Sequence, residues 1–153
     1  MVANRIGEII EEINEYFMVT EGVGVELHPD NVTVETLGKL KAACVTKISI
    51  GIQSFSEKFQ TVLGRKPVDP AKLKEAVDKV AFETVSTDFI FALPNQTYEE
   101  VKSNVDVAFR NGANHVAIYP FYYHYYEQFY TLSYIDKMWG IMRNEAFPKY
   151  IKM

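Results

Sequence analysis

Hydrophobic and polar positions follow two different periods along this chain, a period of two and a helical period, which alternate from one segment to the next. Four segments alternate apolar with small or polar residues at a period of two, which is typical of β-strands. They span residues 23–28, 47–52, 85–93 and 115–119. The segments between them carry apolar residues three and four positions apart, the spacing of one buried helix face. They span residues 6–17, 33–44, 57–63, 70–80 and 98–109.

Residues at the segment boundaries support these spans. Thr33 stands where a helix N-cap is expected, and Pro70 fits the first turn of a helix. Asn111 and Gly112 end the last helical segment as a left-handed C-cap would. Because strands alternate with helices, we expect βαβ units and a parallel sheet. About four units are too few to close a (β/α)8 barrel, and the first element is a helix, so we expect a piece of a barrel.

The two faces of the expected sheet differ in chemistry. The isoleucines of segment 48–52 share a face suited to packing under helices. Small or polar residues occupy the opposite face of the first three strands, namely Gly24, Glu26, His28, Ser49, Gly51, Gln53, Ser86, Asp88 and Ala92. Small residues leave room for a ligand, and polar groups orient it. Since ligands of parallel α/β sheets bind near the carboxyl ends of the strands, Glu26, Gln53 and Asp88 are candidate binding residues.

Each of these polar residues also has a purely structural interpretation. Glu26 could form an ion pair with Lys47 or Arg65 that serves stability alone. Gln53 could cap the helix that follows its strand, and Asp88 could hold the backbone of a loop. Three polar residues on one face of consecutive strands nevertheless favour a shared binding role over three separate structural ones.

Composition narrows the class of protein. The chain has 153 residues, a formal net charge of −4 and 48% hydrophobic residues, which is typical of a folded domain and gives no general attraction to nucleic acid. No stretch approaches the roughly 18 apolar residues that span a bilayer, and the N-terminal residues lack the apolar run of a secretory signal. A single cysteine fits a reducing compartment, so we expect a cytoplasmic protein.

Three sequence blocks resemble, in order, the motifs of radical S-adenosylmethionine enzymes. The block V-E-L-H-P-D at 25–30 resembles the family's E-x-N-P strand end. The block K-I-S-I-G-I-Q-S-F at 47–55, followed by L-G-R at 63–65, resembles R-I-S-I-G-V-Q-S-F with L-G-R. The block V-S-T-D-F-I-F-A-L-P-N-Q-T at 85–97 resembles V-S-x-D-L-I-F-G-L-P-G-Q-T. Their order and spacing, over about residues 5–123, resemble the oxygen-independent coproporphyrinogen III oxidase-like branch.

The resemblance implies a partial (β/α)6 barrel that binds S-adenosylmethionine beside a [4Fe-4S] cluster. At the positions that match the family motifs, Glu26, Gln53, Arg65 and Asp88 would hold polar groups of the cofactor. Phe121 falls in the segment that lines the adenine in the family. The parent protein would cleave the cofactor reductively to a 5′-deoxyadenosyl radical and act on a haem or tetrapyrrole substrate.

This sequence also departs from the family pattern. The three-cysteine motif C-x-x-x-C-x-x-C and the G-G-G-T-P strand end are absent from it. Its one cysteine, Cys44, falls late in an expected helix and is predicted to be a small buried residue. His28 replaces asparagine, Lys47 replaces arginine, and Ala92 and Asn95 replace glycines, although Asn95 can still accept a left-handed turn. We therefore expect the chain by itself to be catalytically inactive.

The resemblance fades after the core expected at residues 1–123. Residues 124–153 form an aromatic-rich segment, expected to be helical, which either packs on the barrel or faces a porphyrin-like ring. Two other functions remain open at this point. The chain could be a self-associating module, a homodimer that pairs through an exposed sheet edge. It could also be a phosphate-binding barrel enzyme without a cluster, although it lacks a glycine-rich anion loop.

Overall fold

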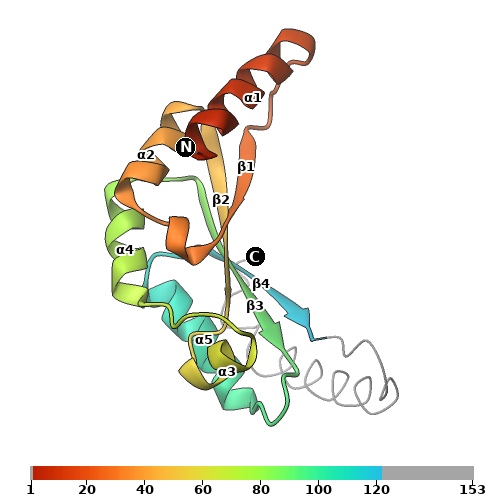
Figure 1. The fold of residues 1–153 in the computed structure, drawn as a ribbon, viewed down its shortest axis with the longest axis vertical. Coiled ribbons are helices and arrows are strands. Elements are labelled where there is room, and N and C mark those ends of the chain that lie inside the picture. The colour runs from red at the N-terminus through yellow and green to blue at the C-terminus, as the bar shows by residue number, and fades with distance from the viewer. Residues whose placement is uncertain (1, 122–153) are drawn as a thin grey trace, which may run out of the picture.

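The computed structural model describes residues 2–121, and its strands form one parallel sheet in the order β1-β2-β3-β4 (Figure 1). The strands are β1 Val23–Leu27, β2 Val45–Gln53, β3 Thr84–Phe91 and β4 His115–Pro120. Each strand pairs with its neighbour in the sequence, and every pairing is parallel. The predicted α/β class and parallel sheet are confirmed. The aromatic-rich segment 124–153 and the boundary before it lie outside the described residues.

Helices lie on one side of the sheet, and all of them except the first, which precedes β1, connect consecutive strands. They are α1 Val2–Tyr16, α2 Val34–Ala42, α3 Glu57–Val62, α4 Pro70–Lys79 and α5 Tyr98–Arg110, with a short 3-10 turn η1 at Pro29–Asn31. In Figure 1, α2, α4 and α5 follow one another along the sheet. A wall of consecutive parallel strands with helices outside is the arrangement of part of a (β/α) barrel.

The hydrophobic core lies between this helical layer and the outer face of the sheet. Ile48, Ile50 and Ile52 of β2 are each at most 1% exposed, as the alternation of the sequence predicts. They belong to one cluster with Leu37, Leu40, Leu73, Ala76, Val77, Val85, Phe89 and Ala108. Burying an aliphatic side chain of this size stabilises the fold by about 1.5–3 kcal/mol. This burial fixes which face of every strand is turned away from the helices.

Helix α1 is only partly buried within the described part of the chain. Ile10 is 7% exposed and Ile6 packs against the same core, but Ile9, Ile13 and Phe17 are 54%, 42% and 70% exposed. The predicted helix is confirmed. Of the apolar residues that recur along it at helical spacing, only those on one side of the helix are buried. The physical reason is that α1 packs against α2, which covers one side of the helix and leaves Ile9 and Ile13 exposed among the described residues.

The predicted helix boundaries are largely confirmed. Thr33 is the N-cap of α2, and its hydroxyl accepts a hydrogen bond from the Thr36 amide at 3.1 Å. Gly112 follows α5 with a φ of +95°, and the Ala113 amide donates back to the Ala108 carbonyl. This is the closing bond of a Schellman turn, in which a residue with a Cβ is strained. The left-handed conformation expected at Asn95 is also present, with a φ of +59°.

The prediction of a buried Cys44 is wrong. Helix α2 ends at Ala42, and Cys44 follows in a left-handed turn with a φ of +62° and an exposed side chain. The Cys44 amide closes this turn on the Lys41 carbonyl. Because of this turn, the Cys44 side chain points outward, and the next residue, Val45, is buried instead at 1% exposed. The helical spacing of the apolar residues predicted that Cys44 is buried, because this spacing does not show that the helix already ends at Ala42.

The left-handed turn at Gly112 provides a test of the fold. A Cβ on Gly112 would lie 3.2 Å from Val77 Cγ1, so Gly112→Ala combines a strained φ with a close contact. We expect this substitution to lower the free energy of unfolding by about 1–2 kcal/mol in urea titrations followed by circular dichroism. Gly38→Ala is the matched control, because a Cβ there meets nothing within 4 Å inside α2. It should raise stability by about 0.5–1 kcal/mol, and equal losses in both variants would contradict the assignment.

Candidate functional site

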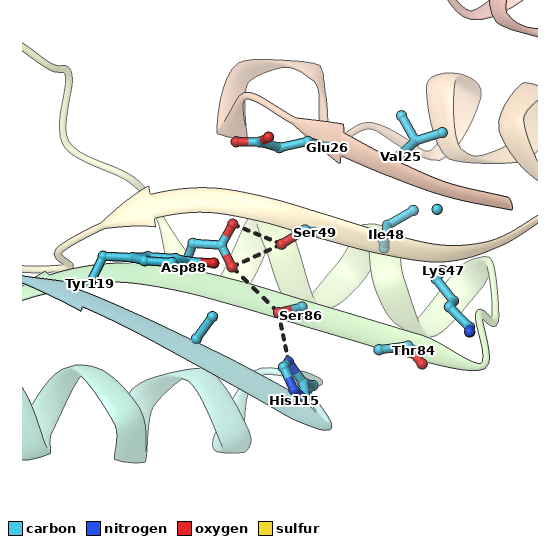
Figure 2. A pocket seen from close by; sticks show the side chains of 12 residues that line it. Val25, Glu26, Lys47, Ile48, Ser49, Thr84, Ser86, Asp88, His115 and Tyr119 are labelled. Atoms are coloured by element: carbon cyan, nitrogen blue, oxygen red, sulfur yellow. Dashed lines mark hydrogen bonds between the residues drawn. The ribbon is translucent and has the colours of Figure 1, made fainter.

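The inner face of the sheet, opposite the helices, carries a pocket lined by small and polar side chains (Figure 2). Parallel register brings Glu26, Ser49, Ser86 and His115 into one row across the four strands. The pocket is lined by Gly24, Val25, Glu26, Lys47, Ile48, Ser49, Thr84, Ser86, Asp88, His115, Ala117 and Tyr119. The two-faced sheet predicted from the sequence is therefore present, and its polar face is accessible within the described part of the chain.

Asp88 is held at the centre of this face by two serine hydroxyls. Ser49 Oγ lies 2.8 Å from each carboxylate oxygen of Asp88, and Ser86 Oγ lies 3.4 Å from Oδ1. Ser86 Oγ also lies 2.9 Å from His115 Nδ1, which continues the chain of hydrogen bonds to β4. These partners are side chains of the inner face. The structural alternative, in which Asp88 anchors a loop backbone, is not what the described residues form.

Glu26 is the penultimate residue of β1, lies on the same face and is exposed. Its carboxylate lies toward the carboxyl end of the sheet, on the same side as Tyr119, while Lys47 lies toward the amino end (Figure 2). No ion pair among the described residues includes Glu26, so the alternative pairing with Lys47 or Arg65 is not formed there. An exposed carboxylate at a strand end is available to accept hydrogen bonds from a ligand.

Gln53 and Arg65 both lie next to Gly51 near the carboxyl end of β2. The register shifts between Ile50 and Gln53, and Gln53 adopts a left-handed φ of +69°. Gln53 Nε2 nonetheless lies 3.1 Å from the place where a Cβ on Gly51 would stand, so its amide covers Gly51. Arg65 Nη1 donates to the Gly51 carbonyl at 2.8 Å. The N-cap position of α3 is Ser56, which leaves Gln53 without the capping role considered as its alternative.

Phe121 is the last described residue and extends the pairing of β3 with β4. Its amide donates to the Phe91 carbonyl at 2.8 Å, one residue beyond the last strand pair. The backbone of this segment therefore lies at the carboxyl end of the sheet, where the family resemblance places the adenine contact. All five predicted cofactor-binding residues lie in the described part of the chain. Glu26, Gln53 and Asp88 belong to strands, Arg65 lies in the loop between α3 and α4, and Phe121 follows β4.

Sequence reasoning did not foresee the supporting partners of Asp88. The alternation places Ser49 and Ser86 on the polar face as small residues and puts His115 at the start of a strand, but it pairs none of them with Asp88. The strand register would have identified these partners, because Ser49, Ser86 and His115 stand opposite one another on adjacent strands. Alternation gives the face of each residue, but not which residues on adjacent strands stand opposite each other.

The residues present do not fit an iron–sulfur cluster. No group of three or more histidine, cysteine, aspartate or glutamate side chains in the described part could hold a metal ion. The single cysteine of the sequence, Cys44, precedes β2 and so lies at the amino end of the sheet, away from Glu26 and Gln53. His28 is engaged otherwise, since its Nδ1 accepts a hydrogen bond from the Asp30 amide at the start of η1.

The hydrogen bonds between Ser49 and Asp88 can be tested by a double-mutant cycle. Ser49→Ala and Asp88→Ala remove the same interaction, so we expect their unfolding free energies to be coupled by about 1 kcal/mol or more. Thr84→Val with Asp88→Ala is the control pair. Thr84 stands four residues from Asp88 on β3, about 13 Å away along an extended strand, so these effects should add within about 0.5 kcal/mol. An additive Ser49–Asp88 pair would refute the interaction.

Comparison with known proteins places this geometry in a family. A model of the radical SAM superfamily matches residues 3–108. The heme chaperone HemW of Bacillus subtilis is 30% identical over 118 residues, which are 76% of this chain and 29% of that protein. HemW of Lactococcus lactis is 35% identical over 103 residues, 66% of this chain and 27% of the relative. The oxygen-independent coproporphyrinogen III oxidase of Cereibacter sphaeroides is 27% identical over 99 residues, 63% of this chain and 22% of the relative.

A solved structure supports the fold assignment. Coproporphyrinogen III oxidase (HemN) from Escherichia coli, described as a radical SAM enzyme, superimposes with a TM-score of 0.70 at 17% identity. The match covers 93% of this chain and 37% of that one. The chain spans less than a third of the length of the three sequence relatives. No helix among the described residues is long and apolar enough to cross a membrane. This chain belongs to the radical SAM superfamily.

Proposed function

We propose that this chain is the central part of a radical SAM protein of the HemW and coproporphyrinogen oxidase type, and that its inner face holds S-adenosylmethionine. The observation that carries the proposal is that Glu26 and Asp88 line the inner-face pocket, while Gln53 and Arg65 both approach Gly51 near the carboxyl end of β2. These are the positions that match the family motifs. The relatives also suggest a haem or tetrapyrrole as the substrate class of the whole protein.

The chemistry of these side chains suits the polar groups of the cofactor. The carboxylates of Glu26 and Asp88 and the amide oxygen of Gln53 can accept hydrogen bonds from ribose hydroxyls or the methionyl ammonium. Arg65 has five N–H donors, so its bond to the Gly51 carbonyl leaves others for the methionyl carboxylate. Gly51 and Ala117 have small side chains or none, so they leave space for a ligand on this surface. S-adenosylmethionine held by these residues would supply a 5′-deoxyadenosyl radical on receiving an electron.

The serine network gives Asp88 a defined orientation before a ligand arrives. Ser49 donates its single hydroxyl hydrogen to one carboxylate oxygen at a time, and each oxygen keeps further acceptor capacity. A carboxylate held in one rotamer loses less conformational entropy when it binds hydroxyl groups. We propose that this chain by itself does not cleave the cofactor, because one cysteine cannot supply a three-cysteine cluster site. A cytoplasmic location is proposed on the cysteine content alone.

Titration by NMR tests the binding proposal on the full chain. We expect S-adenosylmethionine to shift the amide signals of Glu26, Gln53, Arg65 and Asp88. Binding should be weak, with a dissociation constant above about 1 mM. Asp88→Ala should reduce these shifts, because it removes an acceptor at the centre of the face. Asp78→Ala is the control, since that exposed carboxylate on α4 pairs with Lys74. The proposal fails if the inner-face signals do not move or if both variants respond alike.

A second candidate function is self-association through a sheet edge. Among the described residues, β1 pairs only with β2, and β4 pairs only with β3, so each leaves one edge of backbone N–H and C=O groups unpaired by strands. Such an edge can accept a strand from a second copy. Ile13 of α1 is 42% exposed and Phe17, just after the helix, is 70% exposed, which adds apolar surface in the segment before β1.

Sedimentation velocity distinguishes the two states of association. A dimer would sediment with twice the 17.6 kDa mass of one chain at micromolar concentration. Ile13→Glu should then restore the single-chain mass, whereas Val62→Glu, an exposed apolar position on α3, should leave it unchanged. A single-chain mass over the whole concentration range would exclude this candidate and leave the cofactor proposal unaffected.

A further inference from the structure

Two buried amide side chains lie directly behind the loop that joins β2 to α3. Gln60 is 0% exposed and Asn104 is 3% exposed, and both bond to the backbone of this loop. We propose that Gln60, assisted by Asn104, is a positioning residue that holds Gln53 and Arg65 in the geometry needed for the cofactor. This inference rests on the proposed function of those two residues, and it assigns the cause of their placement.

Gln53 needs an external restraint to keep its conformation. Its φ of +69° lies in the left-handed region, which costs a residue with a Cβ about 1 kcal/mol or more. Such a conformation persists only where surrounding contacts determine it. Gln53 still pairs with Phe89 of β3, but the register shifts between Ile50 and Gln53, so the strand pairing in front of it is irregular. Contacts from flanking residues are therefore needed to add to the restraint.

Gln60 supplies this restraint on both sides of Gln53. Its Nε2 donates to the Ile52 carbonyl at 2.8 Å and also to the Ser54 carbonyl. One amide group thereby holds the carbonyls immediately before and after Gln53. The backbone carbonyl of Gln60 accepts from the Arg65 amide at 2.8 Å. The same residue thus fixes the positions of two predicted cofactor-binding residues relative to each other.

Asn104 holds the next part of the loop from helix α5. Its Oδ1 accepts from the Phe55 amide at 2.8 Å, and its side chain lies 3.3–3.4 Å from Ser54 Oγ. Ser54 is 0% exposed and its Oγ in turn accepts from the Ser56 amide at 3.1 Å. The loop after Gln53 is therefore tied to α5 as well as to α3, so it cannot move away from the sheet as one piece.

The unbonded atom of Gln60 supports a positioning role over simple packing. Gln60 Oε1 is buried and has no hydrogen-bond partner among the described residues. Leaving a buried acceptor unpaired costs about 1–3 kcal/mol, a cost that an apolar residue of the same size would avoid. Packing alone would therefore favour methionine or leucine at this position. What glutamine adds is the pair of donated bonds that hold the carbonyls around Gln53.

The substitution Gln60→Met tests this role, because it keeps the volume and removes both donors. The three-bond HN–Hα coupling and the carbon chemical shifts of Gln53 in the free chain report its φ. We expect Gln53 to leave the left-handed region in this variant. The S-adenosylmethionine-induced shifts at Gln53 and Arg65 should weaken about fivefold, as the loss of about 1 kcal/mol of preorganisation predicts.

Matched variants separate positioning from general stability. Val77→Ala removes core volume on α4, away from the loop, so it should lower stability while Gln53 keeps its left-handed φ. If Gln60→Met does not fold, the pair Asn104→Asp and Asn104→Leu replaces it. The aspartate keeps the acceptor for the Phe55 amide and should preserve the Gln53 signature, whereas the leucine should abolish it.

The two hypotheses fail in different ways. A Gln53 that stays left-handed in Gln60→Met, or in Asn104→Leu if that pair is used, overturns the positioning role whatever the cofactor does. The proposed function is overturned if the inner-face amide signals of the unsubstituted chain do not shift when S-adenosylmethionine is added. The conformation of Gln53 is read in the free chain, so it decides the role of Gln60 without any ligand.

Discussion

Packing of helices against one face of a parallel sheet is the constraint on which the other features of this structure depend. The isoleucines of β2 and the aromatic residue Phe89 of β3 are buried beneath α2, α4 and α5. Because side chains alternate along a strand, this burial turns every second residue to the opposite face. That face is left with residues too small or too polar for a core. Ligand-binding chemistry can therefore collect there without weakening the fold.

Charge is unevenly distributed along the inner face. Glu26 stands in the register row of Ser86, and Asp88 stands two residues further toward the carboxyl ends of the strands, whereas Lys47 lies toward the amino end (Figure 2). Asp88 would be costly to desolvate alone, and the Ser49 and Ser86 hydroxyls offset part of that cost. The resulting surface can accept hydrogen bonds at the end where ligands of parallel α/β folds bind. The network also keeps the central carboxylate in place when that position holds no ligand.

Backbone strain is concentrated at the same end of the sheet. Among the described non-glycine residues with positive φ, Gln53 follows the irregular end of β2, and Ala92 and Asn95 follow β3. Strained residues persist where neighbouring groups hold them, and they are frequent at binding sites. Gln60 and Asn104 hold the first of these turns, and the Gln96 side chain accepts from the Leu93 amide in the second. The rigid part of the site is thus its outer, helical side.

The elements, their order, the parallel sheet and the chemical difference between its faces could all be predicted from the sequence. They follow from local periodicity and from boundary residues such as Thr33 and Gly112, whose roles depend on a few neighbours. The family blocks also identified Glu26, Gln53, Arg65 and Asp88, although their cofactor role stays a proposal. The three-dimensional structure was needed to establish that Ser49 and Ser86 hold Asp88, that Cys44 is exposed, and that Gln60 bonds to the loop around Gln53. Those outcomes depend on strand register and on helix ends, which are set by contacts between residues far apart in the chain.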